Sequence, residues 1–370
     1  MPFESGSISF SMFHVAGRLP DDVVERFAAR AAPPLRTLGA EEIRGWVGGR
    51  HLLDVPITEE NAFCAGHLRV TFLRAERKAP ASLVKAQCRI EELAAQRAEG
   101  RPFLKRQQRA EIRRSVIERM LPDMPPQLRA LPLVLAPESS LLLSPAMSDM
   151  QRDLLCVEFF KTTGVKLIPA GPETLARERR RADPDDWERT SLSPEIPDRD
   201  ADAGPGRQFL TWLWFSAEER EGRGTEPDGG DFAFALDGPL VFQREGEGAH
   251  ETLVRRGAPM VSAEAKACLL AGKTLRAARL LFARGDREWR AAFDAERFAV
   301  RGLRVPEDRT APRSWDPATR FQERMIAARE FISMLLSLYD RFVDERNDPQ
   351  RWRAAQRALQ AWVAGRKTRL

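Results

Sequence analysis

The sequence predicts an α+β protein with antiparallel and mixed sheets, divided into more than one domain. Its length of 370 residues is enough for two or three domains, each with a substantial core. Apolar residues make up 43% of the chain and charged residues 31%, a balance typical of folded proteins. Short strands with alternating apolar residues follow one another with amphipathic helices between them, and this pattern favours the α+β class.

Residues 1–77 are predicted to form the first part of a central α+β domain. Apolar and polar residues alternate over 5–14, which is the period of a half-buried strand. A short helix is expected over 23–30, and a second alternating strand over 68–72. Residues 125–170 are expected to complete this domain with strands over 131–135 and 141–143, a helix over 149–162 and a strand over 165–168.

Residues 78–124 are predicted to form a basic helical hairpin. The first helix is expected to follow Pro80, with Ser82 as its N-cap, and to be broken by Gly100 and Pro102. The second is expected over 103–121, with prolines after it. The hairpin is either an exposed, charge-laced helix pair or a surface that contacts phosphates. Its candidate cations are Lys85, Arg89, Lys105, Arg106, Arg109, Arg113 and Arg114.

Residues 171–206 are rich in Pro, Asp and Arg and have almost no apolar periodicity. We expect a mobile linker or surface loop there. Directly after it, 208–215 is a run of apolar and aromatic residues that indicates either a buried strand or a platform on which bases stack. The alternation within this run favours the buried strand.

Residues 207–346 are predicted to form a second, base α+β domain. Short strands over 231–256 and 275–293, with a helix over 262–271 between them, indicate an antiparallel sheet. Apolar residues at spacings of three and four over 320–342 predict a long amphipathic helix. The last segment, 347–370, is expected to be one more helix with a basic end at Arg366, Lys367 and Arg369.

The charge of the chain favours a polyanionic partner only weakly. The net charge is +5 and the isoelectric point about 9.2. Arginine dominates the basic residues, and its planar fork suits phosphate, although a GC-rich genome would raise its frequency equally. The four cysteines, Cys64, Cys88, Cys156 and Cys268, lie far apart and predict neither a zinc site nor a disulfide framework. Without a leader or an apolar membrane span, a soluble cytoplasmic protein is expected.

The sequence holds two weak candidates for chemistry. Gly272, Lys273 and Thr274 resemble the end of a phosphate-binding loop, but a helix precedes them and a strand follows, so Gly272 is interpreted as a helix C-cap. Aspartates in the expected linker suggest nuclease metal ligands, although solvated charge explains them better. These are Asp183, Asp185, Asp186, Asp198, Asp200 and Asp202. We expect no enzyme, no cofactor and no metal.

Several motifs occur in a characteristic order along the chain. They are Gly45-Trp46-Val47, the segment Ala79–Lys85 that opens the hairpin, Met120-Leu121-Pro122 that closes it, GVKLIP over 164–169, the segment Ser262–Lys273, and Arg320-Phe321. In this order the chain resembles the RdgC family of bacterial recombination-associated proteins over nearly its whole length. The resemblance implies a closed homodimeric ring that encircles duplex DNA and restrains strand exchange promoted by RecA.

The resemblance also assigns roles to parts of the chain. It implies that the hairpin tip meets its partner at a gate near Met124 and Pro125, and that the sheet after 207 forms the base interface. Arg255 and Arg256 stand near a basic position of the base domain, and together with Lys273 they join the hairpin cations as candidate DNA contacts. The expected protein is a nucleoid-associated, sequence-nonspecific DNA-binding protein. Two alternatives are a regulator that contacts the recombinase directly and a metal-dependent nuclease of recombination.

Overall fold

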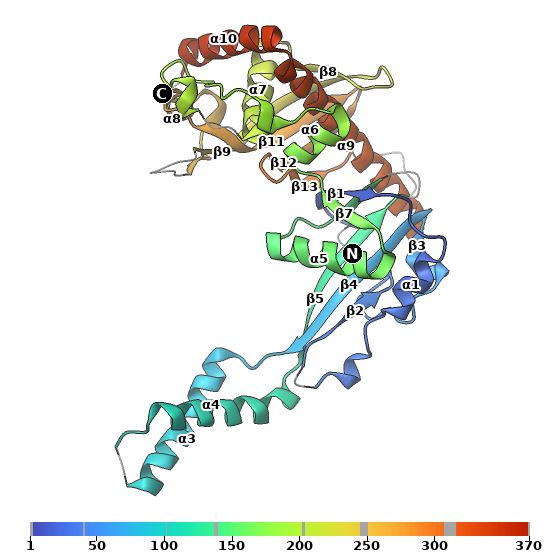
Figure 1. The fold of residues 1–370 in the computed structure, drawn as a ribbon, viewed down its shortest axis with the longest axis vertical. Coiled ribbons are helices and arrows are strands. Elements are labelled where there is room, and N and C mark those ends of the chain that lie inside the picture. The colour runs from blue at the N-terminus through green and yellow to red at the C-terminus, as the bar shows by residue number, and fades with distance from the viewer. Residues whose placement is uncertain are drawn as a thin grey trace.

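The computed structural model describes residues 3–39, 41–100, 102–136, 140–201, 204–244, 251–306 and 316–368. Helices and antiparallel strand pairs confirm the α+β class. Figure 1 shows an elongated chain with a central unit, a helical hairpin that projects from one end, and a base unit at the other. The hairpin and the base unit lean to the same side, so the molecule is concave there, on the left of Figure 1.

The central unit is a strongly bent antiparallel sheet with helices packed on it. Trp46 fills its core, with its ring centroid 4.8 Å from that of Phe27 and 5.1 Å from that of Phe72. Gly45, in the same strand as Trp46, lets that strand approach the segment that follows the first helix, because a Cβ there would lie 2.5 Å from the backbone of Ala32. The elements are β1 (Ile8–Ala16), α1 (Val23–Ala29), β2 (Ile43–Val47), α2 (Glu59–Ala62), β3 (Phe63–Cys64), β4 (His67–Arg77), β5 (Pro126–Leu135), β6 (Leu141–Ser144), α5 (Asp149–Thr163) and β7 (Lys166–Pro169).

The hairpin consists of α3 (Ala81–Glu99) and α4 (Arg106–Met120), followed by a short 3-10 turn (Leu121–Asp123). The expected helices are confirmed, but Ser82 is not the N-cap. Pro80 holds that position with an extended backbone, and no side chain caps the helix. Gly100 ends α3 in the left-handed conformation, with φ of 64°, as its position after the apolar pattern predicts.

The base unit packs helices on one face of an antiparallel sheet. Along the sheet the strands follow the order β10-β9-β11-β12-β13-β1-β6-β5-β4-β2, so the base and central sheets are continuous through β1. The elements are α6 (Pro172–Arg180), α7 (Pro205–Glu219), β8 (Arg223–Thr225), β9 (Asp231–Gln243), β10 (Thr252–Val254), α8 (Ala263–Leu270), β11 (Thr274–Arg284), β12 (Arg287–Asp294), β13 (Ala299–Arg304), α9 (Pro317–Asn347) and α10 (Pro349–Gly365).

The prediction of a strand over 208–215 is wrong, because these residues lie in helix α7. Pro205 occupies the first turn, and the next eleven residues, 206–216, are all buried. Phe209 stacks at 6.3 Å on Trp212 and meets Tyr339 of α9 edge-on at 5.0 Å. A helix covered on every side is apolar all round, and so its sequence lacks the period that would distinguish it from a strand.

The mobile linker expected over 171–206 is also wrong, because the segment is folded against the base unit. Leu175 of α6 is buried in the main core. Arg179 makes two hydrogen bonds to the Asp340 carboxylate on α9, at 3.0 and 2.6 Å, and Arg180 pairs with Asp344 one turn further on. The charges that hid the apolar pattern are therefore the groups that attach the segment to α9.

Candidate nucleic-acid interface

The two helices of the hairpin, which carry the predicted cations, pack on each other. Val84 and Cys88 of α3 pack on Val116 of α4 in a small core of their own. Polar contacts extend this core toward the tip, where Gln108 donates to the Glu99 carboxylate at 2.8 Å. The two helices therefore contact each other from this core to the tip of the hairpin.

Met124 and Pro125, which the resemblance places at the gate, lie at the root of the hairpin. Arg77, the last residue of β4, donates to the carbonyl oxygen of Met124, and β5 begins at Pro126, directly opposite Arg77. The far end of the hairpin is instead where α3 ends after Glu99 and α4 begins at Arg106 (Figure 1). A contact between hairpin tips would therefore involve other residues than these two.

The predicted hairpin cations are all exposed. In the part of the chain that the structure describes, Arg89 pairs with Glu92 at 3.7 Å. Five others have no acidic partner there, and these are Lys85, Arg106, Arg109, Arg113 and Arg114. Between residues 78 and 124 there are eleven Lys and Arg against six Asp and Glu, so this segment alone carries an excess equal to the +5 of the whole chain.

The spacing of these cations gathers them into rows. Arg106, Arg109 and Arg113 are three and four residues apart, which places them along one side of α4, and Lys85 and Arg89 are four apart on α3. Elsewhere arginines are commonly held by acids, as Arg177 is by Asp183 at 2.8 Å. The hairpin therefore presents several guanidinium groups that remain free to bind an external anion.

The candidates in the base unit divide into two kinds. Arg255 and Arg256 follow β10 and are exposed. Lys273 is only 8% exposed, and its Nζ donates to the Thr252 hydroxyl at 2.6 Å. Lys273 therefore cannot contact DNA in this conformation, because β11, which starts one residue later, draws it into the sheet.

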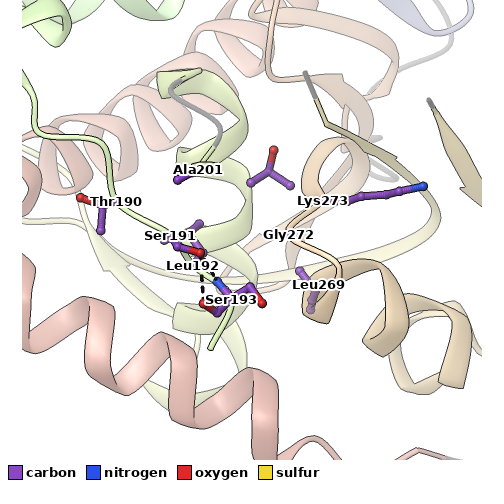
Figure 2. A pocket seen from close by; sticks show the side chains of 9 residues that line it. Thr190, Ser191, Leu192, Ser193, Ala201, Leu269, Gly272 and Lys273 are labelled. Carbon is purple, nitrogen blue, oxygen red and sulfur yellow. Dashed lines mark hydrogen bonds between the residues drawn. The ribbon is translucent and has the colours of Figure 1, made fainter. Parts of the chain in front are cut away.

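The resemblance of 272–274 to a phosphate-binding loop has no structural counterpart. Gly272 follows α8 with φ of 77°, which confirms that it ends a helix. Figure 2 shows the small cavity beside it, lined also by the segment 190–193, and the Lys273 side chain extends away from it. With a volume of about 10 Å³, it holds at most one water molecule.

Aspartates of the segment 171–206 make ion pairs and hydrogen bonds within that segment. Asp183 and Asp185 both accept from Arg177, at 2.8 and 2.7 Å. Asp198 accepts from the Ser191 N–H at 2.7 Å, and Asp202 lies outside the described residues. Among the residues that the structure describes, no group of three or more metal-ligating side chains occurs.

One basic group escaped the sequence analysis. Arg290 of β12 and Arg301 and Arg304 of β13 are exposed on the base sheet. The alternation of exposed and buried residues along β12 is a signal that could have shown Arg290. The two residues of β13 are three apart, and an ordinary strand would place them on opposite faces.

No helix in the described ranges is long and apolar enough to cross a membrane. No protein-family model and no curated protein matches the chain. The function proposed below therefore depends on the charge and geometry of these residues, together with the resemblance noted in the sequence.

Proposed function

We propose that this protein binds double-stranded DNA through its phosphates, without reading the base sequence. The observation that carries the proposal is the row of exposed, unpaired arginines on the projecting hairpin, Arg106, Arg109 and Arg113. A cation that has no acidic partner can neutralise a phosphate without giving up an existing ion pair. Binding to duplex DNA then releases condensed counterions and is favourable on any sequence.

We further propose that two copies close a ring around the DNA, as the resemblance to the RdgC family implies. The concave side of the protomer and its two projecting ends suit such a ring (Figure 1). Helix α3 also has a second apolar side, turned away from α4, where Leu83, Ile90 and Leu93 are 45%, 61% and 38% exposed. Phe103, in the turn at the hairpin end, is 77% exposed. These side chains would gain most from a partner hairpin.

A ring of this kind would act on recombination by occupying the DNA. Duplex DNA inside it is withheld from a recombinase, so the protein would limit RecA access in proportion to its concentration, at the nucleoid. The alternative of direct contact with the recombinase differs in stoichiometry. It predicts inhibition of filaments already formed, at protein levels too low to coat the DNA.

The test is fluorescence anisotropy with random-sequence duplex across a salt series. The variant combines Arg106→Gln, Arg109→Gln and Arg113→Gln. Its matched control removes the same charge from the outer side of α10 with Arg351→Gln, Arg353→Gln and Arg357→Gln, all exposed positions. If all three hairpin arginines of both copies in the ring contact phosphates, the slope of log affinity against log salt should fall by about 5.4, since each of the six contributes about 0.9.

The control should keep the wild-type slope. Equal slopes for the hairpin variant and the control would place the DNA track elsewhere. A wild-type protein that does not bind duplex, or binds it independently of salt, would refute the proposed function.

A further inference from the structure

The base sheet has one covered face and one open face. Along β12, Trp289, Ala291 and Phe293 are buried, whereas Glu288 and Arg290 between and beside them are exposed. Figure 1 shows α7 and α10 on one side of this sheet, and the hairpin on the opposite side. The open face is therefore turned toward the concave side of the protomer.

A bulge in β13 places two arginines on this open face. Arg304 lies opposite Arg290, and Arg301 lies opposite Ala292, so three residues of β13 span two of β12. Gly302 has φ of 62°, the left-handed conformation that such a bulge requires. Because residues directly opposite across a ladder share a face, Arg301 and Arg304 both point outward with Arg290.

Two of these arginines repel each other across the sheet. Arg290 and Arg304 are like charges directly opposite each other, a pairing that destabilises a sheet. In the described ranges neither they nor Arg301 has an ion pair or a side-chain hydrogen bond. Arg279 on the neighbouring strand β11, by contrast, is held by Asp237 at 3.2 Å. Three of the arginines on this face are therefore left without a partner among the residues that the structure describes.

A cleft of about 490 Å³ lies beside Arg301, at the junction of the base and central units. Ser9, Ser148 and Gln151 line it with hydroxyl and amide groups, and Arg297 lies at its edge, where Asp149 accepts from it at 3.1 Å. Arg301 is thus the cation in the cleft that has no acidic partner among the described residues. The polar lining can donate hydrogen bonds to phosphate oxygens.

We propose that Arg290, Arg301 and Arg304, with the cleft beside Arg301, form a second phosphate-binding site for the DNA backbone. The inference rests on the proposed DNA-binding function and names a site apart from the hairpin, on the base sheet next to its junction with the central unit. A duplex on the concave side would be held at two places along its path. The charge on this face disfavours the other use of an open sheet, which is contact with the same face of a second copy.

The test variant combines Arg290→Gln, Arg301→Gln and Arg304→Gln, and its conservative counterpart replaces the same residues by Lys. Anisotropy with random-sequence duplex should show a slope reduced by about 2.7 for each copy in the ring, about 5.4 in all, and an affinity lower by at least about 10²-fold at 0.1 M salt. The Lys variant should keep the slope, since it keeps the charge. The α10 triple variant is again the matched control, and circular dichroism melting checks that each variant folds.

The outcomes separate this site from the proposed function. If the hairpin variant loses salt-dependent binding while the base variant matches the control, the second site is refuted and the function stands. If the base variant binds DNA normally but loses its dimer in sedimentation, the face contacts a second copy and the inference is wrong. If the wild-type protein shows no salt-dependent binding at all, the proposed function itself fails.

Discussion

Self-association through α3 can be tested by making its exposed apolar side polar. The perturbation combines Ile90→Ser on α3 with Phe103→Ser beyond its end, the two most exposed large apolar residues of the hairpin at 61% and 77%. Neither belongs to the core between α3 and α4, so the hairpin should still fold. A matched control changes Met150→Ser and Val157→Ser on α5, which are 80% and 48% exposed.

The expected loss of dimerisation free energy follows from the apolar surface that the two side chains expose to water. The exposed fractions of Ile90 and Phe103 add up to more than the surface of one large side chain, and the full burial of one such side chain contributes about 2 kcal/mol. In a symmetric dimer both copies contribute, so the double variant should lose about 5 kcal/mol at most. About half of that, a factor of about 10² in the dissociation constant, is a realistic expectation because burial at an interface is incomplete.

Sedimentation velocity over a concentration series measures this constant directly. Wild-type protein and the α5 control should dimerise alike, and the hairpin variant should need far higher concentration. An unchanged constant for the hairpin variant would show that dimers form without this surface. A wild-type protein that stays monomeric up to high micromolar concentration would refute self-association altogether.

Two further predictions concern stability. Glu345 accepts hydrogen bonds from Trp212 Nε1 at 2.8 Å and from Arg220 at 2.9 Å, so Arg220→Ala leaves a largely buried carboxylate short of a partner. Urea unfolding should show a free energy of unfolding lower by about 2 kcal/mol. An unchanged unfolding midpoint would contradict this prediction. The Arg74 guanidinium, helped by Arg44, holds the pKa of Glu42 below its usual 4.5, so this ion pair stabilises the fold above pH 4.5 and less as pH falls through the lower folded pKa. Glu42→Gln should therefore cost about 1 kcal/mol at pH 7 and progressively less as the pH falls below 4.5, and a cost independent of pH would rule out the ion pair as its source.

Much of the fold follows from local patterns in the sequence. The alternation that begins at Ile8 and the spacing along α9 are both confirmed, because each element has one buried face and one exposed face. The same rule fails for α7, whose buried residues surround it completely. It also fails for α6, whose arginines pair with α9, a partner distant in sequence.

The candidate interface shows a similar division. The hairpin cations were predictable because charge on a short, isolated helix pair stays at the surface. The burial of Lys273 was not, since it depends on where β11 starts. Arg301 and Arg304 share a face only because of the bulge at Gly302. A sequence pattern with a period of two residues does not reveal such an inserted residue, so this shared face could not be predicted.

The strand β1 has a consequence for how the chain is made. Its first residues pair with β13, as Ile8 does with Leu303, whereas its last residues pair with β6 and β7. During synthesis the start of this strand must therefore wait until Leu303 and its neighbours have emerged from the ribosome before its partner exists. Until then Ile8 and Phe10, both fully buried in the folded protein, have no core to enter. A pairing so distant in sequence slows folding, and this strand is a segment that a chaperone would have to protect.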